Sequence, residues 1–455
     1  MFFLKKKLLY CCSLLISFVL LITSLFFNLT YSAFNSDNVK KTIASYSSFD
    51  YAGRLPGTDE NSLVSELIRK NFENSNLIPL NESYKENFSV ICPIKTNTVP
   101  YLNISYNGIV TDELEYGKDF KEDMLNFKNN SVLFSSTDNV NVNTTSIEIS
   151  NNTGNYIFYI PKDNDFSFRS SFMSSFPYNM AIMITSDTYK IISDSIAAGA
   201  EVSVHVPFIN EERVISNIVG VIKGSNSKLP PLILTSHYDH LGTDGLGNTY
   251  TGALDNASGT AFLIEMQRSL STYAKPKRDI IFVALNAEEF GLLGSKNFAE
   301  SNKDKINGAE VINFDMIGSD NYPINFMLSE NIKDKDSKLL KSLENLSKKH
   351  TTPYEVEYKN ASDHASFGDI GLDALTISHS NMTKIHTPND KVEFISTSAI
   401  DSVYTVVLDK IKDSSYGNIS IFIHDKYSIL VFAILFGFLI SIPFFYKKRY
   451  YKNKL

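Results

Sequence analysis

Apolar residues are concentrated in two long runs, one near each end of the chain. The first, Leu8 to Leu29, carries no charge, and the second extends from Tyr427 to Tyr446. Each run is long enough to cross a bilayer as a helix, which takes about 20 apolar residues. Lys residues precede the first run and Lys/Arg residues follow the second, which favours membrane spans over buried core helices. The pattern predicts a span at each end, the first being either an anchor or a signal peptide.

Between these runs the pattern of polar and apolar positions changes twice. A Gly/Pro turn, Gly53 to Thr58, precedes an amphipathic helix near Glu60–Asn74. From about 86 to 205 the chain is rich in Asn, Ser and Tyr, with short strand-like runs such as YIFYIP and MAIMIT. Beyond that, the runs IVGVI, LILTS, IIFVAL and VINFD alternate with helical stretches such as Ala261–Tyr273 and Asp336–Lys349. Such alternation is typical of an α/β domain with a largely parallel sheet.

These changes of pattern divide the chain into segments. The folded part is expected to begin after the first apolar run and to be interrupted by the Asn/Ser/Tyr-rich region. The predicted segments are an anchor or signal peptide (1–33), the start of the folded domain (34–89), an inserted region (90–200), the α/β core (201–412), a juxtamembrane linker (413–426), a transmembrane helix (427–446) and a cytoplasmic basic tail (447–455).

Charge is distributed unevenly and excludes one class of partner. The 455 residues carry a formal net charge of −7, but the segment between the two tails holds 35 basic against 50 acidic residues. A body this acidic does not bind phosphate backbones, so we expect no nucleic-acid partner. Positive flanks stay in the cytoplasm, which places the middle of the chain outside the cell. Cys11 and Cys12 lie in the first span and Cys92 is alone outside it, so the exterior domain has no internal disulfide.

Acidic and histidine residues follow the strand-like runs of the predicted core. LILTS leads into HYDH, IIFVAL is followed by a pair of Glu residues, and VINF ends at an Asp. In parallel sheets, ligands bind at the carboxyl ends of the strands. The segments GALDNASG and IHTPND each add one candidate. The candidate residues are His237, Asp239, Asp255, Glu288, Glu289, Asp315 and His386.

Each candidate also has a plainer interpretation. His237 and Asp239 share one face of an extended strand, and alone they would be a surface pair. Asp255 stands where a helix starts and could simply cap it. The adjacent carboxylates of Glu288 and Glu289 are costly to hold together without a cation. We favour a metal site because chance assembly of the whole set at one sheet edge is improbable.

The residue types suit a pair of zinc ions. Zinc takes imidazole nitrogen and carboxylate oxygen, and catalytic sites keep a position open for water. Five ligands with one shared fit two zincs about 3.5–4 Å apart. A further carboxylate, not bound to metal, is needed to take a proton from the attacking water. Asp239 is the natural partner for the second nitrogen of His237.

The motifs HYD, GALDNASG, NAEEFGLLGS and IHTPND, with the strand end at Asp315, resemble the zinc aminopeptidase family. That family includes secreted bacterial leucyl aminopeptidases and, more distantly, glutamate carboxypeptidase. The resemblance covers roughly residues 45–410 and implies a mixed, mainly parallel sheet flanked by helices, with two Zn²⁺ per chain. It implies that His237 and Asp315 bind one zinc, Glu289 and His386 bind the other, Asp255 bridges both, Glu288 is the general base and Asp239 orients His237.

The expected function is release of N-terminal residues from peptides by an enzyme anchored in the cell membrane with its catalytic domain outside. A glutaminyl cyclase-like transferase is one alternative, although cyclases of that type lack the first His ligand, and His237 is present. A non-catalytic relative is another, although every ligand is intact. A carboxypeptidase stays open, as do the oligomeric state and the side-chain preference.

Other segments carry weaker signals. Ser362 to Phe367 resembles a family segment that lines the site, with Asp363 and His364 supporting its geometry. Tyr358 lies just upstream, but its spacing does not fit an oxyanion-stabilising Tyr. The inserted region is similar to the protease-associated insert of some members, or is a loop elaboration. The histidines without motif support, expected to be surface or core polar residues, are His205, His240, His350, His379 and His424.

Overall fold

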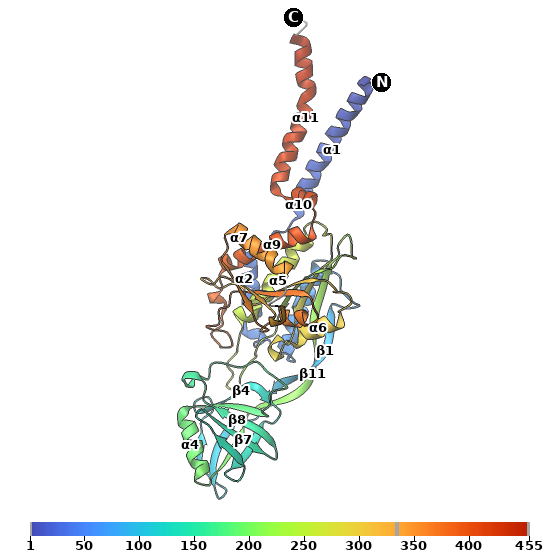
Figure 1. The fold of residues 1–455 in the computed structure, drawn as a ribbon. Coiled ribbons are helices and arrows are strands. Elements are labelled where there is room, and N and C mark those ends of the chain that lie inside the picture. Colours follow the sequence, from blue (N-terminus) through green and yellow to red (C-terminus); the bar gives the residue numbers. More distant parts are fainter. Residues whose placement is uncertain (1, 333–335, 453–455) are drawn as a thin grey trace.

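The computed structural model describes residues 2–332 and 336–452, which form three parts arranged along one axis (Figure 1). Two terminal helices lie at one end, an α/β domain is in the middle, and a smaller β-rich domain lies at the other end. The β-rich domain is inserted into the α/β domain through two long strands, β1 (Lys85–Lys95) and β11 (Phe208–Ile222). The two terminal helices therefore lie far from the insert.

Helices α1 (Phe2–Thr30) and α11 (Lys426–Lys452) leave the α/β domain at the same end, next to the short helix α10 (Asn418–His424) (Figure 1). The Tyr10 hydroxyl donates to the carbonyl of Leu439 over 2.9 Å, so the two long helices contact each other. Both are long and apolar enough to cross a membrane. The last three residues of the predicted basic tail, 453–455, lie outside the described residues.

The α/β domain is built on one mixed sheet that contains eight strands in the described part of the chain. Parallel pairing joins β13, β12, β14 and β17 in that order, and β15 with β16. Antiparallel pairing adds β1 and β11 at one edge and joins β15 to β17. The remaining strands are β12 (Leu232–His237), β13 (Ile280–Leu285), β14 (Glu310–Phe314), β15 (Ile324–Leu328), β16 (Tyr354–Tyr358) and β17 (Asp373–Ser378).

Helices cover both faces of this sheet because its central strands are apolar on both sides. Along β12, Leu232 and Leu234 face one core while Ile233 faces the other, as the two-residue period of a strand requires. The first core packs under α2 (Ser36–Tyr46), α3 (Asp59–Asn74), α5 (Gly259–Ser271), α7 (Lys338–His350) and α9 (Thr397–Ser415). The second packs under α6 (Leu293–Ser301) and α8 (His364–Asp369).

The predicted amphipathic helix near Glu60–Asn74 is confirmed as α3. It begins directly after the predicted turn because the Thr58 hydroxyl accepts a hydrogen bond from the Asn61 N–H and caps the first turn. Its apolar face, which includes Ile68 and Phe72, is fully buried against the sheet. The turn itself is therefore fixed against the domain core.

The insert has two sheets, and its core is a third cluster that also takes in α/β-domain residues such as Leu241, Tyr250 and Phe290. Its elements are β2 (Tyr101–Tyr106), β3 (Ile109–Leu114), β5 (Ser131–Ser135) and β10 (Glu201–His205) in one sheet; β4 (Phe120–Phe127), β6 (Asn139–Val142), β7 (Ser146–Asn151), β8 (Gly154–Tyr159) and β9 (Met180–Ile184) in the other; and helix α4 (Ser186–Ala197). The expected boundary at 90 falls inside β1, which pairs with β11. The expected boundary at 200 falls just before β10, which pairs with β2.

Buried charges join the insert to the α/β domain. The Lys121 ammonium on β4 lies 2.8 Å from the Asp244 carboxylate, and both side chains are buried. Beside this pair, the Gly245 N–H donates to Glu122 over 2.9 Å. Removing one partner of a buried ion pair leaves an uncompensated charge, which costs about 3–5 kcal/mol. The insert is therefore held in one position against the loop that follows β12.

Candidate metal centre

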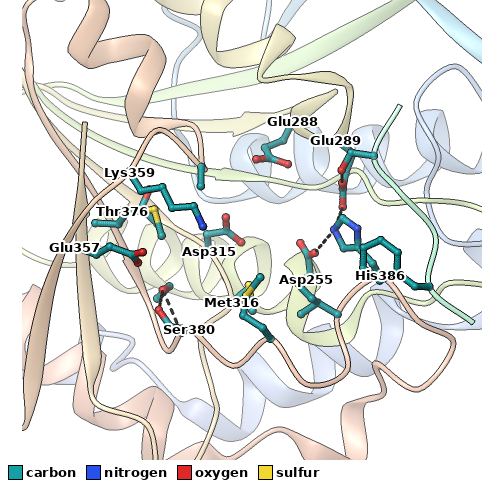
Figure 2. Close-up of a pocket in the computed structure, with 17 residues that line it drawn as sticks. Asp255, Glu288, Glu289, Asp315, Met316, Glu357, Lys359, Thr376, Ser380 and His386 are labelled. Atoms are coloured by element: carbon teal, nitrogen blue, oxygen red, sulfur yellow. Dashed lines mark hydrogen bonds and ion pairs between the residues drawn. The ribbon is translucent and has the colours of Figure 1, made fainter. Parts of the chain in front are cut away.

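The carboxyl ends of three neighbouring parallel strands place the candidate residues together. Strand β12 ends at His237, the turn after β13 carries Glu288 and Glu289, and Asp315 directly follows β14. Asp255 comes from the turn before α5, and His386 from the loop after β17. Figure 2 shows the carboxylates of Asp255, Glu288, Glu289 and Asp315 around one pocket, with His386 at its side.

His237 is the centre of the first group. Its Nε2 lies 3.5 Å from Asp315 Oδ1, 3.6 Å from Asp255 Oδ1 and 4.0 Å from Glu288 Oε2. Its Nδ1 faces Asp239 Oδ1 at 3.6 Å. One imidazole nitrogen is thus turned toward three carboxylates and the other toward Asp239, as the sequence analysis expects for an oriented ligand.

His386 and Glu289 form a second group on the other side of Asp255. His386 Nε2 lies 3.3 Å from Asp255 Oδ2 and 3.5 Å from Glu289 Oε1. The two oxygens of Asp255 therefore face different histidines: Oδ1 faces His237 and Oδ2 faces His386. The side chains of His240, Asp255 and Glu289 also lie close enough together to share one ion.

The cluster is buried and carries excess negative charge. Burial and neighbouring carboxylates, with Glu289 foremost, raise the pKa of Glu288 well above its usual value. Burial alone would lower the pKa of His386, but Glu289 and Asp255 outweigh it and raise that pKa to about 9. Both nitrogens of His237 and Oδ1 of Asp315 are buried without a hydrogen-bond partner among the described residues. This donor set, imidazole nitrogen with carboxylate oxygen, fits zinc.

Three buried groups hold the loops that carry the candidates. Asp239 accepts hydrogen bonds from the backbone N–H groups of Glu288 and Glu289, each over 3.2 Å. Asp390, from the IHTPND segment, accepts from the backbone of Leu254 and Asp255 over 2.8 and 3.0 Å. Arg54, in the turn before α3, donates to four backbone carbonyls, those of Tyr46, Tyr238, Thr251 and Gly252. Backbone positions near Asp239 and Asp255 are thereby fixed.

His240 was missed by sequence reasoning. It is fully buried, and its Nδ1 lies 3.0 Å from Glu289 Oε1 and 4.0 Å from Asp255 Oδ2. The alternation of a strand would have placed it opposite His237 and Asp239, but β12 ends at His237 and the chain turns. His240 is a core polar residue, one of the two expected possibilities, but it also contacts Glu289 and Asp255, which the sequence did not indicate. Its place in the HYDH run was the available signal.

The weaker candidates have structural surroundings of their own. His364 is buried, with one ring nitrogen 2.7 Å from the Thr376 hydroxyl and the other 3.0 Å from the Lys359 carbonyl. Burial lowers its pKa to about 4, so it is neutral at ordinary pH. Asp363 is buried, and burial raises its pKa to about 7. Tyr358 lies on β16 and is not among the described residues that line the pocket.

Residues 217–411 match the model of peptidase family M28, which confirms the resemblance predicted from the motifs. Aminopeptidase YwaD of Bacillus subtilis is 29% identical over 210 residues, 43% of this chain and 45% of that protein. Aminopeptidase NAALADL1 of Mus musculus is 39% identical over 129 residues, 27% of this chain and 16% of that protein. The chain thus covers less than half the length of these curated relatives.

Solved structures confirm the predicted fold class. An aminopeptidase from Aneurinibacillus superposes with a TM-score of 0.59 and 19% identity, covering 84% of this chain and 95% of that one. BSAP, a zinc aminopeptidase from Bacillus subtilis, gives a TM-score of 0.56 and 16% identity, covering 84% of this chain and 96% of that one. The α/β domain with its mixed sheet is therefore an architecture already seen in solved aminopeptidases.

Proposed function

Because residues 217–411 match peptidase family M28, we propose that this chain is a two-zinc aminopeptidase. The observation that carries the proposal is the position of Asp255 between two groups of donors. Its Oδ1 lies 3.6 Å from His237, and its Oδ2 lies 3.3 Å from His386. A carboxylate that faces two separate histidines is suited to bridge two ions.

The candidate side chains have distinct roles in this proposal. His237 and Asp315 would hold the first zinc, Glu289 and His386 would hold the second, and Asp255 would serve both. Asp239 holds His237 through its Nδ1 and also fixes the backbone of the Glu288-Glu289 pair. When bound, the zinc pair polarises the scissile carbonyl and lowers the pKa of the attacking water.

Glu288 is the proposed general base. Both Glu288 and Glu289 line the pocket, but the Glu288 side chain is 14% exposed, whereas that of Glu289 is 1% exposed and lies near His386 and His240. Glu288 takes a proton from the attacking water and passes it to the leaving amine. Its carboxylate lies near the first group, 4.0 Å from His237 Nε2, and so within reach of a water held there.

The pocket supports exopeptidase action. It has a volume of about 480 Å³ and is lined by the carboxylates of the site together with apolar side chains, including Met316, Met327 and Ile385. A free N-terminal amine is attracted to the carboxylates, and the first side chain of the peptide can contact the apolar residues. Removing the positive charge of the amine should therefore abolish productive binding.

A peptide panel tests this proposal. Full-length protein in detergent should release single residues from peptides with a free N-terminus and leave N-acetylated copies intact, as followed by mass spectrometry. A chelator should stop the reaction, and zinc should restore it. Release from the C-terminus would point to a carboxypeptidase, and cyclisation of an N-terminal Gln to a cyclase. Either result, or no reaction at all, would contradict the proposal.

We further propose that the chain is anchored in the cell membrane with its α/β domain outside. Helices α1 and α11 are each apolar enough to span a bilayer, and both leave the domain at the same end (Figure 1). Protease added to intact cells should digest the region between residues 34 and 425 and spare the basic tail, since Lys/Arg flanks stay inside. An epitope placed on that tail checks the result. Loss of the epitope when protease is added to intact cells would contradict the proposed orientation.

A further inference from the structure

One stretch of the insert crosses into the candidate metal centre. Residues 168–173, here called the strap, form an irregular stretch between β8 and β9, outside the α/β domain in sequence. In space the strap lies against the second group of donors, and Phe168 and Ser171 line the pocket. A segment some 120 residues away from Glu289 in the chain is therefore part of the site.

The strap contacts Glu289 through both its side chain and its backbone. The Ser171 hydroxyl donates to Glu289 Oε2 over 2.6 Å, and the Phe172 N–H donates to the Glu289 carbonyl over 3.0 Å. Because Oε2 is taken by Ser171, Oε1 is the oxygen that faces His386, at 3.5 Å. The hydroxyl thus determines which oxygen of Glu289 is presented to the second group.

The strap also holds His386. The ring Nδ1 of His386 donates to the Arg169 carbonyl over 3.1 Å, and the Arg169 N–H donates to the His386 carbonyl over 2.9 Å. The Phe168 ring stacks on the imidazole with centroids 5.4 Å apart. Because Nδ1 is held by this bond, Nε2 is the nitrogen that faces Asp255 and Glu289 and that would bind a metal ion after losing its proton. A ligating histidine is normally fixed by such a bond from its second nitrogen.

The strap is itself tied to the insert. The Ser170 N–H and hydroxyl donate to the two oxygens of Asp123, a fully buried residue on β4, over 3.0 and 2.8 Å. The Tyr159 hydroxyl donates to the same carboxylate over 2.6 Å. By contrast, Nδ1 of His237 faces Asp239, a residue of the α/β domain, at 3.6 Å. Among the described residues, hydrogen bonds from the insert reach Glu289 and His386, and none reaches His237 or Asp315.

We propose that the insert positions the ligands of the second metal ion alone, with Ser171 and the Arg169 carbonyl as the positioning groups. This inference rests on the proposed function, since it assumes that Glu289 and His386 bind metal. Partners that orient metal ligands change metal affinity by about 10–100-fold when removed. The affinity of the second site is thus set partly by a domain that contributes no ligand itself.

Zinc titration of full-length apo-protein against a fluorescent chelator tests the inference. Loss of one binding step in His386→Ala identifies the second site. Ser171→Ala should raise the dissociation constant of that step by about 10–100-fold and leave the other step unchanged. Ser171→Thr keeps the hydroxyl and should restore most of the affinity. Ser175→Ala removes an exposed hydroxyl four residues further on and serves as the matched control.

A second measurement follows from the reciprocity of coupled binding. If the strap favours the second ion, that ion must stabilise the strap. Zinc loading should slow hydrogen exchange at the amides of Arg169 and Phe172, which donate to the two ligand residues, by roughly 5–150-fold. The same loading of His386→Ala should leave their exchange unchanged.

The outcomes separate this inference from the proposed function. If the protein binds zinc in two steps but Ser171→Ala leaves the affinity of the second step unaltered, the inference is overturned and the two-zinc proposal stands. The same holds if Ser171→Ala weakens both steps equally. The inference would also be overturned if zinc did not change the rate of hydrogen exchange at the strap amides. Wild-type protein that binds a single ion would contradict the proposed function and remove this inference with it.

Discussion

Replacing Glu288 by Gln should lower turnover by roughly 10²–10⁴ while both metal ions stay bound, because an amide keeps the shape of the carboxylate but cannot accept a proton. Glu288 and Glu289 both line the pocket, but the Glu288 side chain is the more exposed of the two. Burial and neighbouring carboxylates already disfavour the charged form of Glu288, so a neutral amide should not destabilise the fold. Turnover, metal content and peptide binding should be measured on the same preparation, and added zinc should not rescue the variant.

Glu289→Gln is the matched control, since it makes the same chemical change one residue further along. Glu289 is enclosed by Ser171, His240 and His386, and its side chain is buried. The amide should therefore weaken metal binding, and excess zinc should restore part of the activity. If Glu288→Gln sheds metal instead, or keeps near-normal turnover, the roles within the pair are assigned wrongly.

The second large effect is expected at Asp255. Asp255→Ala should reduce zinc from about two ions per chain to below one, because this carboxylate faces both groups of donors. Asp315→Ala and His386→Ala should each keep about one ion. Metal analysis after dialysis measures the difference, and activity should fall to background in Asp255→Ala.

The fold of the Asp255 variant should survive. Burial would raise the pKa of Asp255, but His386, His240 and His237 outweigh it and lower that pKa in the metal-free protein. Asp255→Ala loses this attraction, so thermal unfolding of the apo-form should occur at a lower temperature than in the wild type. Asp304→Ala, which removes an exposed carboxylate, controls for the loss of an Asp as such. A variant that keeps both ions without Asp255 would contradict its bridging role.

The sequence was informative where chemistry is tied to local pattern. Strand-like runs were readable because central strands of a covered sheet are apolar on both faces, as Leu232 and Ile233 show. The residues directly after those runs, such as His237 and Asp315, fall at one edge because parallel strands end together. The resemblance of the GALDNASG and IHTPND motifs to the aminopeptidase family then brought in Asp255 and His386 from separate loops. The convergence of these side chains was therefore predictable.

Contacts made by residues distant in sequence were not predictable. Nothing in a Ser-rich stretch indicates that Ser171 meets Glu289, because that contact depends on how the insert is held by Lys121 and Asp244. Arg54 likewise belongs to an ordinary turn, and only the fold brings four carbonyls to its guanidinium. Each of these contacts is decided by tertiary packing rather than by local pattern.

A zinc-edge anomalous difference map of crystals grown with zinc tests the two-zinc centre most directly. Two peaks are expected in the pocket, one between His237 and Asp315 and the other between Glu289 and His386, with one oxygen of Asp255 directed to each. A single peak, or a second peak held by His240 without His386, would contradict this expectation.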